Sequence, residues 1–298
     1  MQRVNQQAAP RITGLTALAM VAFAANSLLC RLALGAAQID AASYTSLRLL
    51  SGAATLWAIV ALSRRTGPVP EGGGWVSGVM LFLYAIAFSF AYLTLDAGTG
   101  ALILFGAVQV TMIVIGFIEG HRPHALEWLG LISAFGGLVY LVSPGISAPA
   151  PLGSMLMAVA GIAWGIYSLR GRGSGDPVVA TAANFARAVP FALIVSLLAV
   201  ADFQVTDRGA WLAVLSGAVA SGVGYVIWYA ALKGLTTTRA AIVQLSVPVL
   251  AAIGGVLFLS EEITPRLIIS SIVILGGIAL AIWGRDYVAR ISVETTGD

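Results

Sequence analysis

Apolar residues run in long, unbroken stretches along this chain, and short polar connections separate them. Ten of these stretches come close to the roughly 20 mostly apolar residues that a helix needs to cross a bilayer. Strands of a membrane β-barrel would alternate apolar and polar residues, and these stretches do not alternate. We therefore expect an all-α integral membrane protein with ten transmembrane helices. The expected helices are residues 12–34, 41–62, 75–95, 99–118, 126–143, 152–170, 178–200, 210–232, 240–259 and 266–284.

The connections between the expected helices are short, and the longest covers residues 63–74. Short connections are typical of antiparallel helices that pack against each other. They leave no room for a separate soluble domain that binds a nucleotide or carries out catalysis. Around Asp96 the chain must make a very tight turn between two spans.

The composition agrees with a membrane location. Hydrophobic residues make up 59% of the 298 residues and charged residues 10%, whereas about 25% of a globular domain is charged. The 16 lysines and arginines exceed the 13 acidic residues by too little to indicate nucleic acid as a partner. The single cysteine, Cys30, excludes an intramolecular disulfide and a cysteine-based metal cluster. We expect it to be a small buried apolar residue.

The positive charges of the connections predict the orientation, because cationic residues in short loops favour the cytoplasmic side. With the N-terminus inside, the outer connections carry Arg208 and Arg266, and 11 cations lie on the inner side. Both termini are therefore expected in the cytoplasm, and the protein in the inner (plasma) membrane. The inner cations are Arg3, Arg11, Arg64, Arg65, Arg122, Arg170, Arg172, Lys233, Arg239, Arg285 and Arg290.

The second half of the chain repeats the first at an offset of 139 residues. Residues 14–31 align with residues 153–170, and Arg48 falls on Arg187. Two arginines in register within helices so poor in charge argue against chance similarity between apolar segments.

The repeat divides the chain into two units, residues 12–143 and residues 152–284, each with five expected helices. Because five is odd, the second unit enters the membrane from the opposite side, and the two units are inverted repeats. Inverted repeats suit a transporter whose midplane site opens alternately to the two faces of the membrane.

The matched residues resemble the drug/metabolite transporter superfamily, in particular its ten-helix members built from two EamA-type repeats. The resemblance rests on a polar end of the first helix, an arginine early in helices two and seven, an acid closing helices four and nine, and a proline in helix nine. These residues are Asn26, Ser27, Arg31, Arg48, Glu119, Trp164, Gly165, Arg187, Pro248 and Glu261. The chain is most similar to the YddG-type amino-acid exporters. It departs from the family pattern in the fourth helix, where no proline matches Pro248.

The resemblance implies a secondary transporter or facilitator that exports aromatic or other apolar amino acids, or similar small metabolites, by alternating access. It implies a small-molecule substrate and surrounding lipid, with no nucleic acid, cofactor, metal or catalytic residue, so the protein is not expected to be an enzyme. A homodimer is compatible with it. Within the superfamily, a carrier for organic anions, nucleotide-sugars or drugs is the alternative.

Two functions outside the superfamily, an intramembrane enzyme and a channel, would need residues that the sequence does not offer. An intramembrane enzyme requires nucleophiles or metal ligands at depth, and a channel requires rings of charged residues. His121 and His124 have no third ligand in view. Because no expected helix carries an interior acid or histidine, we expect facilitated diffusion, or coupling that does not use a buried acid.

Two deep arginines, Arg48 and Arg187, admit two interpretations. Each could hold a substrate carboxylate through its planar guanidinium. Each could instead bind helix-end carbonyls or an acid and so stabilise the fold. The second interpretation is favoured, because a position shared across a family with many substrates is a poor guide to one substrate.

Aromatic and amide side chains deep in the helices are the expected cavity wall, since a deep Tyr or Trp needs a polar partner or a wet cavity. Packing in the core or against lipid remains the alternative for any single residue. With the arginines, the candidates are Asn26, Tyr44, Arg48, Tyr84, Phe88, Gln109, Trp164, Tyr167, Arg187, Tyr225, Trp228 and Gln244.

Two prolines inside helices are candidate hinges. Pro248 has no N–H, so it frees the carbonyl of Gln244, and Pro190 frees the carbonyl of Ala186 in the same way. A freed carbonyl in a membrane must be satisfied by protein, water or ligand. Residues 244–248 are therefore expected to bend and to face the cavity, with a bend that contacts no ligand as the alternative.

Overall fold

The computed structural model describes residues 2–63, 74–120, 124–145, 147–171, 175–235 and 237–295. These residues form helices and short turns, and within the described ranges no strand is present apart from an isolated bridge between Ile39 and Val205. The helices are α1 (Gln2–Gly35), α2 (Ala41–Leu62), α3 (Trp75–Ala91), α4 (Ala97–Ile118), α5 (Ala125–Val142), α6 (Pro151–Arg170), α7 (Pro177–Leu198), η1 (Val200–Asp202), α8 (Asp207–Val214), η2 (Leu215–Val223), α9 (Gly224–Leu232), α10 (Thr237–Gln244), α11 (Ser246–Leu259) and α12 (Pro265–Thr295).

The described part of the chain contains nine helices or helix pairs long and apolar enough to cross a membrane. The third expected span, residues 75–95, is shorter than predicted, because α3 ends at Ala91 and has 17 residues. At 1.5 Å per residue it is about 26 Å long, slightly less than the hydrocarbon core. Residues 92–94 form a turn, and Asp96 is extended and directly precedes α4. The protein is a multi-pass membrane protein.

Two expected spans are interrupted helices. The span over 210–232 runs from Asp207 to Leu232, but its middle segment η2 is a π-helix. The span over 240–259 is broken at Leu245 into α10 and α11. Apolar periodicity alone cannot show either feature, because a π-turn and a short break both keep the run of apolar residues intact.

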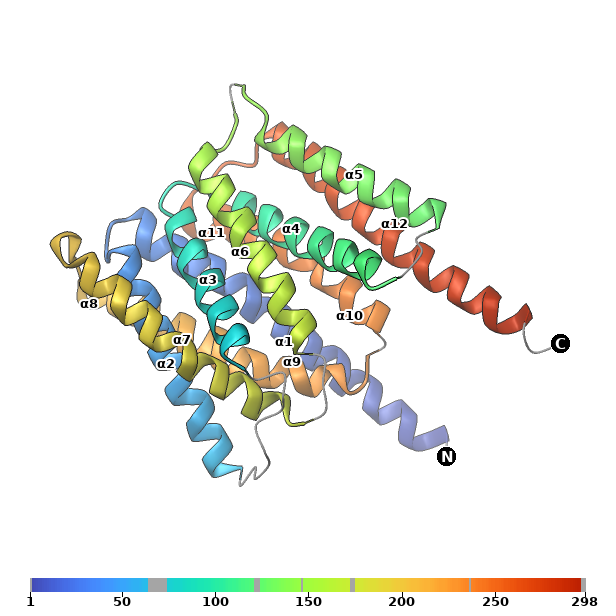
Figure 1. Cartoon of the computed structure of the whole chain (residues 1–298), viewed down its shortest axis with the longest axis horizontal. Coiled ribbons are helices and arrows are strands. Elements are labelled where there is room, and N and C mark those ends of the chain that lie inside the picture. The colour runs from blue at the N-terminus through green and yellow to red at the C-terminus, as the bar shows by residue number, and fades with distance from the viewer. Residues whose placement is uncertain are drawn as a thin grey trace.

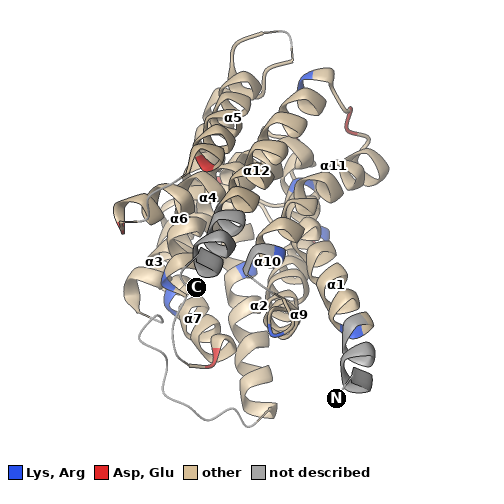
Figure 2. Ribbon diagram, turned by 90° about the vertical axis from the view of Figure 1, so that its right-hand side faces the viewer, with Lys and Arg blue, Asp and Glu red and all other residues tan. Residues whose placement is uncertain are grey.

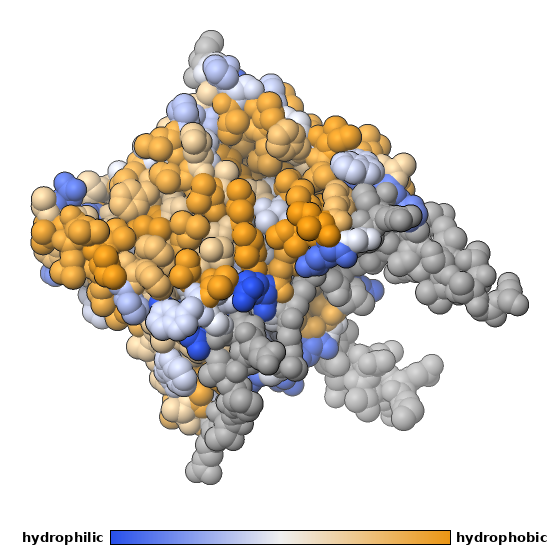
Figure 3. Space-filling model, viewed as in Figure 1, coloured by the Kyte–Doolittle hydropathy of each residue, from blue (hydrophilic) through white to orange (hydrophobic). Residues whose placement is uncertain are grey.

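The surface is apolar over most of its area, as expected for a protein in lipid. Figure 3 shows a broad band of hydrophobic side chains across one face, with hydrophilic residues along its margins. Charged residues are sparse along the ribbon (Figure 2). Large apolar side chains that are more than half exposed include Leu129, Ile132, Leu152, Leu197 and Ile272.

Glycines bring helices from the two halves of the chain into close contact. Figure 1 shows α5 and α12 side by side along one edge of the molecule, with both chain ends on the same side of the bundle. A Cβ on Gly277 would lie 2.6 Å from the carbonyl oxygen of Gly130. A Cβ on Gly161 would lie 2.7 Å from the Leu104 carbonyl oxygen, so α6 packs equally closely on α4. Small residues at such contacts are typical of membrane helix packing.

Candidate functional site

A cavity of about 940 Å³ lies between the two halves of the chain. Residues from α1, α3, α4, α5, α6, α7, α9, α10 and α12 line it. Nine of the twelve residues predicted from the sequence are among them: Asn26, Tyr84, Phe88, Gln109, Trp164, Tyr167, Tyr225, Trp228 and Gln244. The structure brings together residues up to 218 positions apart, such as Asn26 and Gln244.

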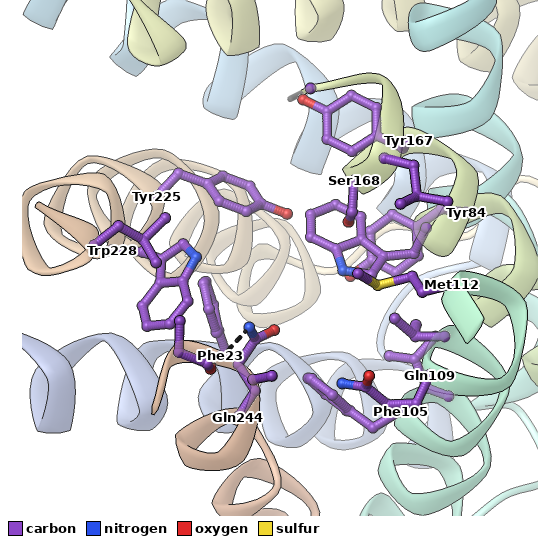
Figure 4. A pocket seen from close by; sticks show the side chains of 18 of the residues that line it. Phe23, Tyr84, Phe105, Gln109, Met112, Tyr167, Ser168, Tyr225, Trp228 and Gln244 are labelled. Atoms are coloured by element: carbon purple, nitrogen blue, oxygen red, sulfur yellow. Dashed lines mark hydrogen bonds between the residues drawn. The ribbon is translucent and has the colours of Figure 1, made fainter. Parts of the chain in front are cut away.

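Trp164 is at the centre of the aromatic wall. Its ring stacks on those of Tyr167 and Tyr225, with centroid distances of 5.2 and 5.6 Å, and lies 4.8 Å from the ring of Tyr84. Figure 4 shows Tyr225 on one side of the hollow and Met112 on the opposite side. These rings give the cavity flat apolar faces with hydroxyl and indole groups at their edges.

Phe23, Phe105, Met112, Thr181 and Tyr229 also line the cavity and were not predicted. Phe23 lies three residues before Asn26 on the same helix, so it shares the Asn26 face. Its ring contacts that of Trp228 at 5.9 Å. The helical spacing from Asn26 would have found this residue, but no sequence signal distinguishes Phe105 or Met112 from ordinary packing residues.

The π-helix η2 positions the polar floor of the cavity. Asn26 Oδ1 accepts hydrogen bonds from Ser216 Oγ at 2.8 Å and Ser221 Oγ at 3.3 Å. The two serines are five residues apart, the spacing that a π-turn aligns. The wide turn therefore directs two hydroxyls at one amide, and all three side chains are buried.

Gln244 lies in the cavity wall at the end of α10, directly before the break at Leu245. Pro248, four residues after Gln244, has no N–H to donate to the Gln244 carbonyl. The Leu245 N–H turns back to the Ile242 carbonyl at 3.0 Å, and Gln244 Nε2 donates to the Ala240 carbonyl at 3.2 Å. Pro248 itself is not a lining residue, and its role as a hinge stays a prediction.

Pro190 behaves differently, because α7 continues through it from Pro177 to Leu198 without a break. It does not line the cavity. Its hinge role also stays a prediction.

Three predicted residues, Tyr44, Arg48 and Arg187, do not line the cavity. Arg48 is 2% exposed and lies behind the wall, with its guanidinium carbon 5.3 Å from the Tyr84 ring centre and 4.8 Å from that of Phe88. Tyr44, one turn earlier on α2, is fully buried. Arg187 is partly buried and donates from Nη1 to Asn184 Oδ1 at 3.4 Å. The two arginines of the repeat therefore lie in different surroundings.

The cavity reaches the surface at one end, which we call the mouth. Exposed residues line it there: Glu119 after α4, Gly171 after α6, Gly175 before α7 and Lys233 after α9. The mouth is thus at the end of the bundle that carries the α4–α5 and α6–α7 connections. Several residues predicted to lie in these and neighbouring connections are outside the described part of the chain: Arg64, Arg65, Arg122, Arg172 and His121.

At the opposite end, Arg31, Asp96 and Glu261 form what we call the closed-end cluster. Arg31 lies 3.3 Å from Glu261 Oε1 and 3.6 Å from Asp96 Oδ1. It also donates to the carbonyls of Tyr92 and Leu93, at 3.2 and 3.4 Å. The cluster joins α1, the α3–α4 turn and the end of α11. Arg31 and Glu261 are 230 positions apart, so the sequence does not predict their pairing.

Glu261 also binds the start of α4, where its two carboxylate oxygens accept from the Ala97 N–H at 2.9 and 3.1 Å. Anions are stabilised at this position, because the first N–H groups of a helix have no partner within the helix. Burial raises the pKa of the Glu261 carboxyl above its ordinary value of 4.5; the Ala97 N–H opposes this, Asp96 adds to it, and Arg31 opposes it.

Within the described residues no group of three or more His, Cys, Asp or Glu side chains is arranged to hold a metal ion. The site therefore consists of aromatic, amide and hydroxyl groups, with charged residues near its two ends. Such a cavity can bind a small molecule.

Comparisons with known proteins point to one family. Residues 151–283 match the model of the EamA-like transporter family. An uncharacterised protein from Pseudomonas aeruginosa is 52% identical over 91% of this chain and 94% of its own length. A protein of Escherichia coli K12 named a probable amino-acid metabolite efflux pump is 25% identical over 72% of this chain and 78% of its own. A crystal structure with 21% identity, covering 89% of this chain and 98% of that chain, has a TM-score of 0.61, which shows a shared fold alone.

Proposed function

Because the chain belongs to the EamA-like transporter family of the drug/metabolite transporter superfamily, we propose that it exports amino acids across the inner membrane by alternating access. The substrates we propose are aromatic or other apolar amino acids, or similar small metabolites. The observation that carries this proposal is a deep cavity open at the mouth and closed at the other end by the closed-end cluster. A cavity open at one end is what one state of an alternating-access carrier requires.

The proposal takes the chain as ten spans in two inverted repeats, residues 12–143 and 152–284, with α3 as a short tenth span. It also places both termini in the cytoplasm, which makes the mouth cytoplasmic and the described state inward-open. The matched arginines and the short, charged connections support this arrangement. A substrate would enter from the cytoplasm, and the two repeats would then tilt about the cavity.

The repeat supplies a matching pair for closing the mouth. Arg170 is the counterpart of Arg31 at the offset of 139, and Glu119 is the counterpart of Glu261 at an offset of 142. Both are exposed in this structure. In the outward-open state we expect Arg170 and Glu119 to approach each other as Arg31 and Glu261 do here.

The lining supports an amino-acid or other small amphipathic substrate. Stacked rings around Trp164 offer flat apolar contacts, and Asn26, Gln109 and Gln244 offer amide groups. The Escherichia coli relative carries a name of the same substrate class. The burial of Arg48 directly behind Tyr84 and Phe88 favours a second candidate, a carrier of organic anions.

Flux through the purified protein tests the proposal. The protein is reconstituted in liposomes, and uptake of a panel of labelled amino acids is measured with and without a pH gradient. We expect flux of aromatic or apolar amino acids that the gradient leaves unchanged. Absence of amino-acid flux, together with flux of an organic anion, nucleotide-sugar or cation, would contradict the substrate class.

A matched pair of tryptophan variants tests the cavity itself. Trp164→Ala removes the centre of the aromatic wall, and Trp211→Ala removes a tryptophan that is 67% exposed and outside the cavity. The first should raise the KM for aromatic substrates, and the second should leave it unchanged. Unchanged kinetics in a folded Trp164→Ala protein would show that this cavity does not hold the substrate.

A further inference from the structure

Arg48 is a buried cation without a carboxylate partner in the described part of the chain, where the recorded ion pairs belong to Arg31. Its Nη1 has no hydrogen-bond partner, and neither has the hydroxyl of Tyr44 one turn earlier. A buried donor left unpaired, and a charge above all, is costly unless something pairs with it. The guanidinium therefore lies ready to stabilise a negative charge that the protein does not supply.

Tyr84 connects this charge to the cavity. Arg48 Nη2 donates to Tyr84 Oη at 3.0 Å, and Tyr84 lines the cavity. Because the phenolic oxygen already accepts this bond, its own proton is available for an acceptor. A cation that donates to the oxygen also makes the O–H a stronger donor, since hydrogen bonds in a chain polarise one another.

We propose that Tyr84 binds the substrate carboxylate and that Arg48 acts through it as a positioning residue. The inference rests on the proposed export of small amphipathic substrates and adds that a carboxylate is the group recognised at this place. The guanidinium carbon lies 5.3 and 4.8 Å from the centres of the Tyr84 and Phe88 rings, and its hydrogen bond holds the Tyr84 hydroxyl beside the cavity. A substrate carboxylate would supply the negative charge that Arg48 lacks.

The part of the cavity between Tyr84 and the mouth suits the amino group of the same substrate. The stacked faces of Trp164, Tyr167 and Tyr225 attract a cation through their ring electrons. Glu119 and Glu127 lie among the lining residues toward the mouth. A zwitterion would therefore bind with its carboxylate at Tyr84 and its ammonium toward the mouth.

Three related probes test this recognition in liposomes. Uptake of labelled L-phenylalanine is competed with 3-phenylpropionate, which lacks the ammonium, and with phenethylamine, which lacks the carboxylate. Tyr84→Phe removes the hydroxyl but keeps the ring. The control, Tyr229→Phe, removes a hydroxyl from the same cavity that bonds to Thr181 at 2.9 Å and not to Arg48.

We expect Tyr84→Phe to lower the apparent affinity for L-phenylalanine and for 3-phenylpropionate about tenfold, roughly the loss of one hydrogen bond to a charged group. The apparent affinity for phenethylamine should change by less than about twofold in Tyr84→Phe. Tyr229→Phe should not alter the affinity for any one of the three probes relative to the other two. Arg48→Lys keeps the charge and should keep part of the preference for the carboxylate. The inference is overturned if Tyr84→Phe lowers the affinity for all three probes equally. It is also overturned if the unsubstituted protein binds phenethylamine more tightly than 3-phenylpropionate.

Thermal stabilisation of the purified protein separates this inference from the proposed function. If L-phenylalanine is not transported but 3-phenylpropionate raises the Tm of the normal protein and not of Tyr84→Phe, carboxylate recognition stands and amino-acid export fails. If neither carboxylate is transported and neither raises the Tm, recognition by Tyr84 is overturned as well.

Discussion

The two ends of the cavity carry similar residues in different arrangements. At the closed end, Arg31 contacts Glu261 and Asp96 and binds the carbonyls that end α3. At the mouth, Arg170 donates to Ser77 Oγ at 3.4 Å, and no ion pair to Glu119 is recorded among the described residues. The ends therefore differ in which charges are engaged, and not in the kind of residue present. If the protein alternates as proposed, the separated charges at the mouth indicate how the closed-end cluster would be arranged after that end opens.

The largest effect is expected from reversing a charge at the closed end. Glu261→Lys places a cation beside Arg31 and leaves the Ala97 N–H without its acceptor. Because removing one partner of a largely buried pair is strongly destabilising, we expect transport to fall roughly tenfold or more. The closed end should also open, which labelling of Ser27→Cys by a membrane-impermeant thiol reagent added on the closed-end side would report in a Cys30→Ala background.

Glu262→Lys is the control for this experiment. It makes the same change one residue later, at an exposed position. Among the described residues, Arg31 forms its ion pairs with Asp96 and Glu261 and not with Glu262. Its labelling and transport should match those of the parent protein. Equal effects of the two substitutions would show that the closed-end cluster does not keep this end shut.

A smaller effect is expected from the corresponding change at the mouth. Glu119→Lys should slow transport by roughly threefold to tenfold, because the outward-open state would lose its Arg170 partner. The labelling of Ser27→Cys from the closed end should not rise. The double substitution Glu119→Lys and Arg170→Glu should recover part of the rate. Transport unaffected by Glu119→Lys would argue against a pairing at the mouth.

The closed end should also respond to pH. The pKa of the Glu261 carboxyl is raised in the closed arrangement, mainly through burial. We expect this pKa to return to its ordinary value once solvent reaches the carboxyl. The closed arrangement therefore holds the proton more tightly, and lowering the pH toward the ordinary pKa favours closure. Labelling of Ser27→Cys from this side should fall as the medium is acidified. In a Glu261→Gln background only the thiol's own titration should remain, and an identical pH profile in both backgrounds would refute the effect.

The smallest effect is expected at Lys233. This side chain is exposed at the mouth, where solvent and salt screen its charge. Lys233→Gln should change the flux of a zwitterion by less than about twofold. A larger change would show that the charge of the mouth, as well as its shape, selects the substrate.

The positions of the helices were largely predictable, because lipid requires continuous apolar runs and local signals mark where helices begin. Asp40 and Asp176 accept bonds from the N–H groups of Ser43 and Val178, and α2 and α7 begin at the residues that follow them. The early end of α3 was not predictable, since residues 92–95 carry no charge, glycine or proline that would mark the end of a helix.

The aromatic wall was predictable from depth and helical spacing, but the arrangement of charges was not. Arg48 and Arg187 look alike in the sequence, yet one is buried behind Tyr84 and the other is partly exposed beside Asn184. The direction in which a helix presents a side chain depends on packing against distant helices. The pairing of Arg31 with Glu261 likewise depends on the tertiary arrangement of α1 and α11.

The π-helix η2 makes the identity of the cavity wall depend on how one segment winds. Each residue of a regular helix turns the chain by about 100°. If the nine residues Leu215–Val223 wound as a regular α-helix, Tyr225 and Trp228 would rotate away from the hollow, although every aromatic residue would still be present. Relatives that wind a segment of the same length regularly would therefore present a different wall to their substrates with unchanged aromatic content.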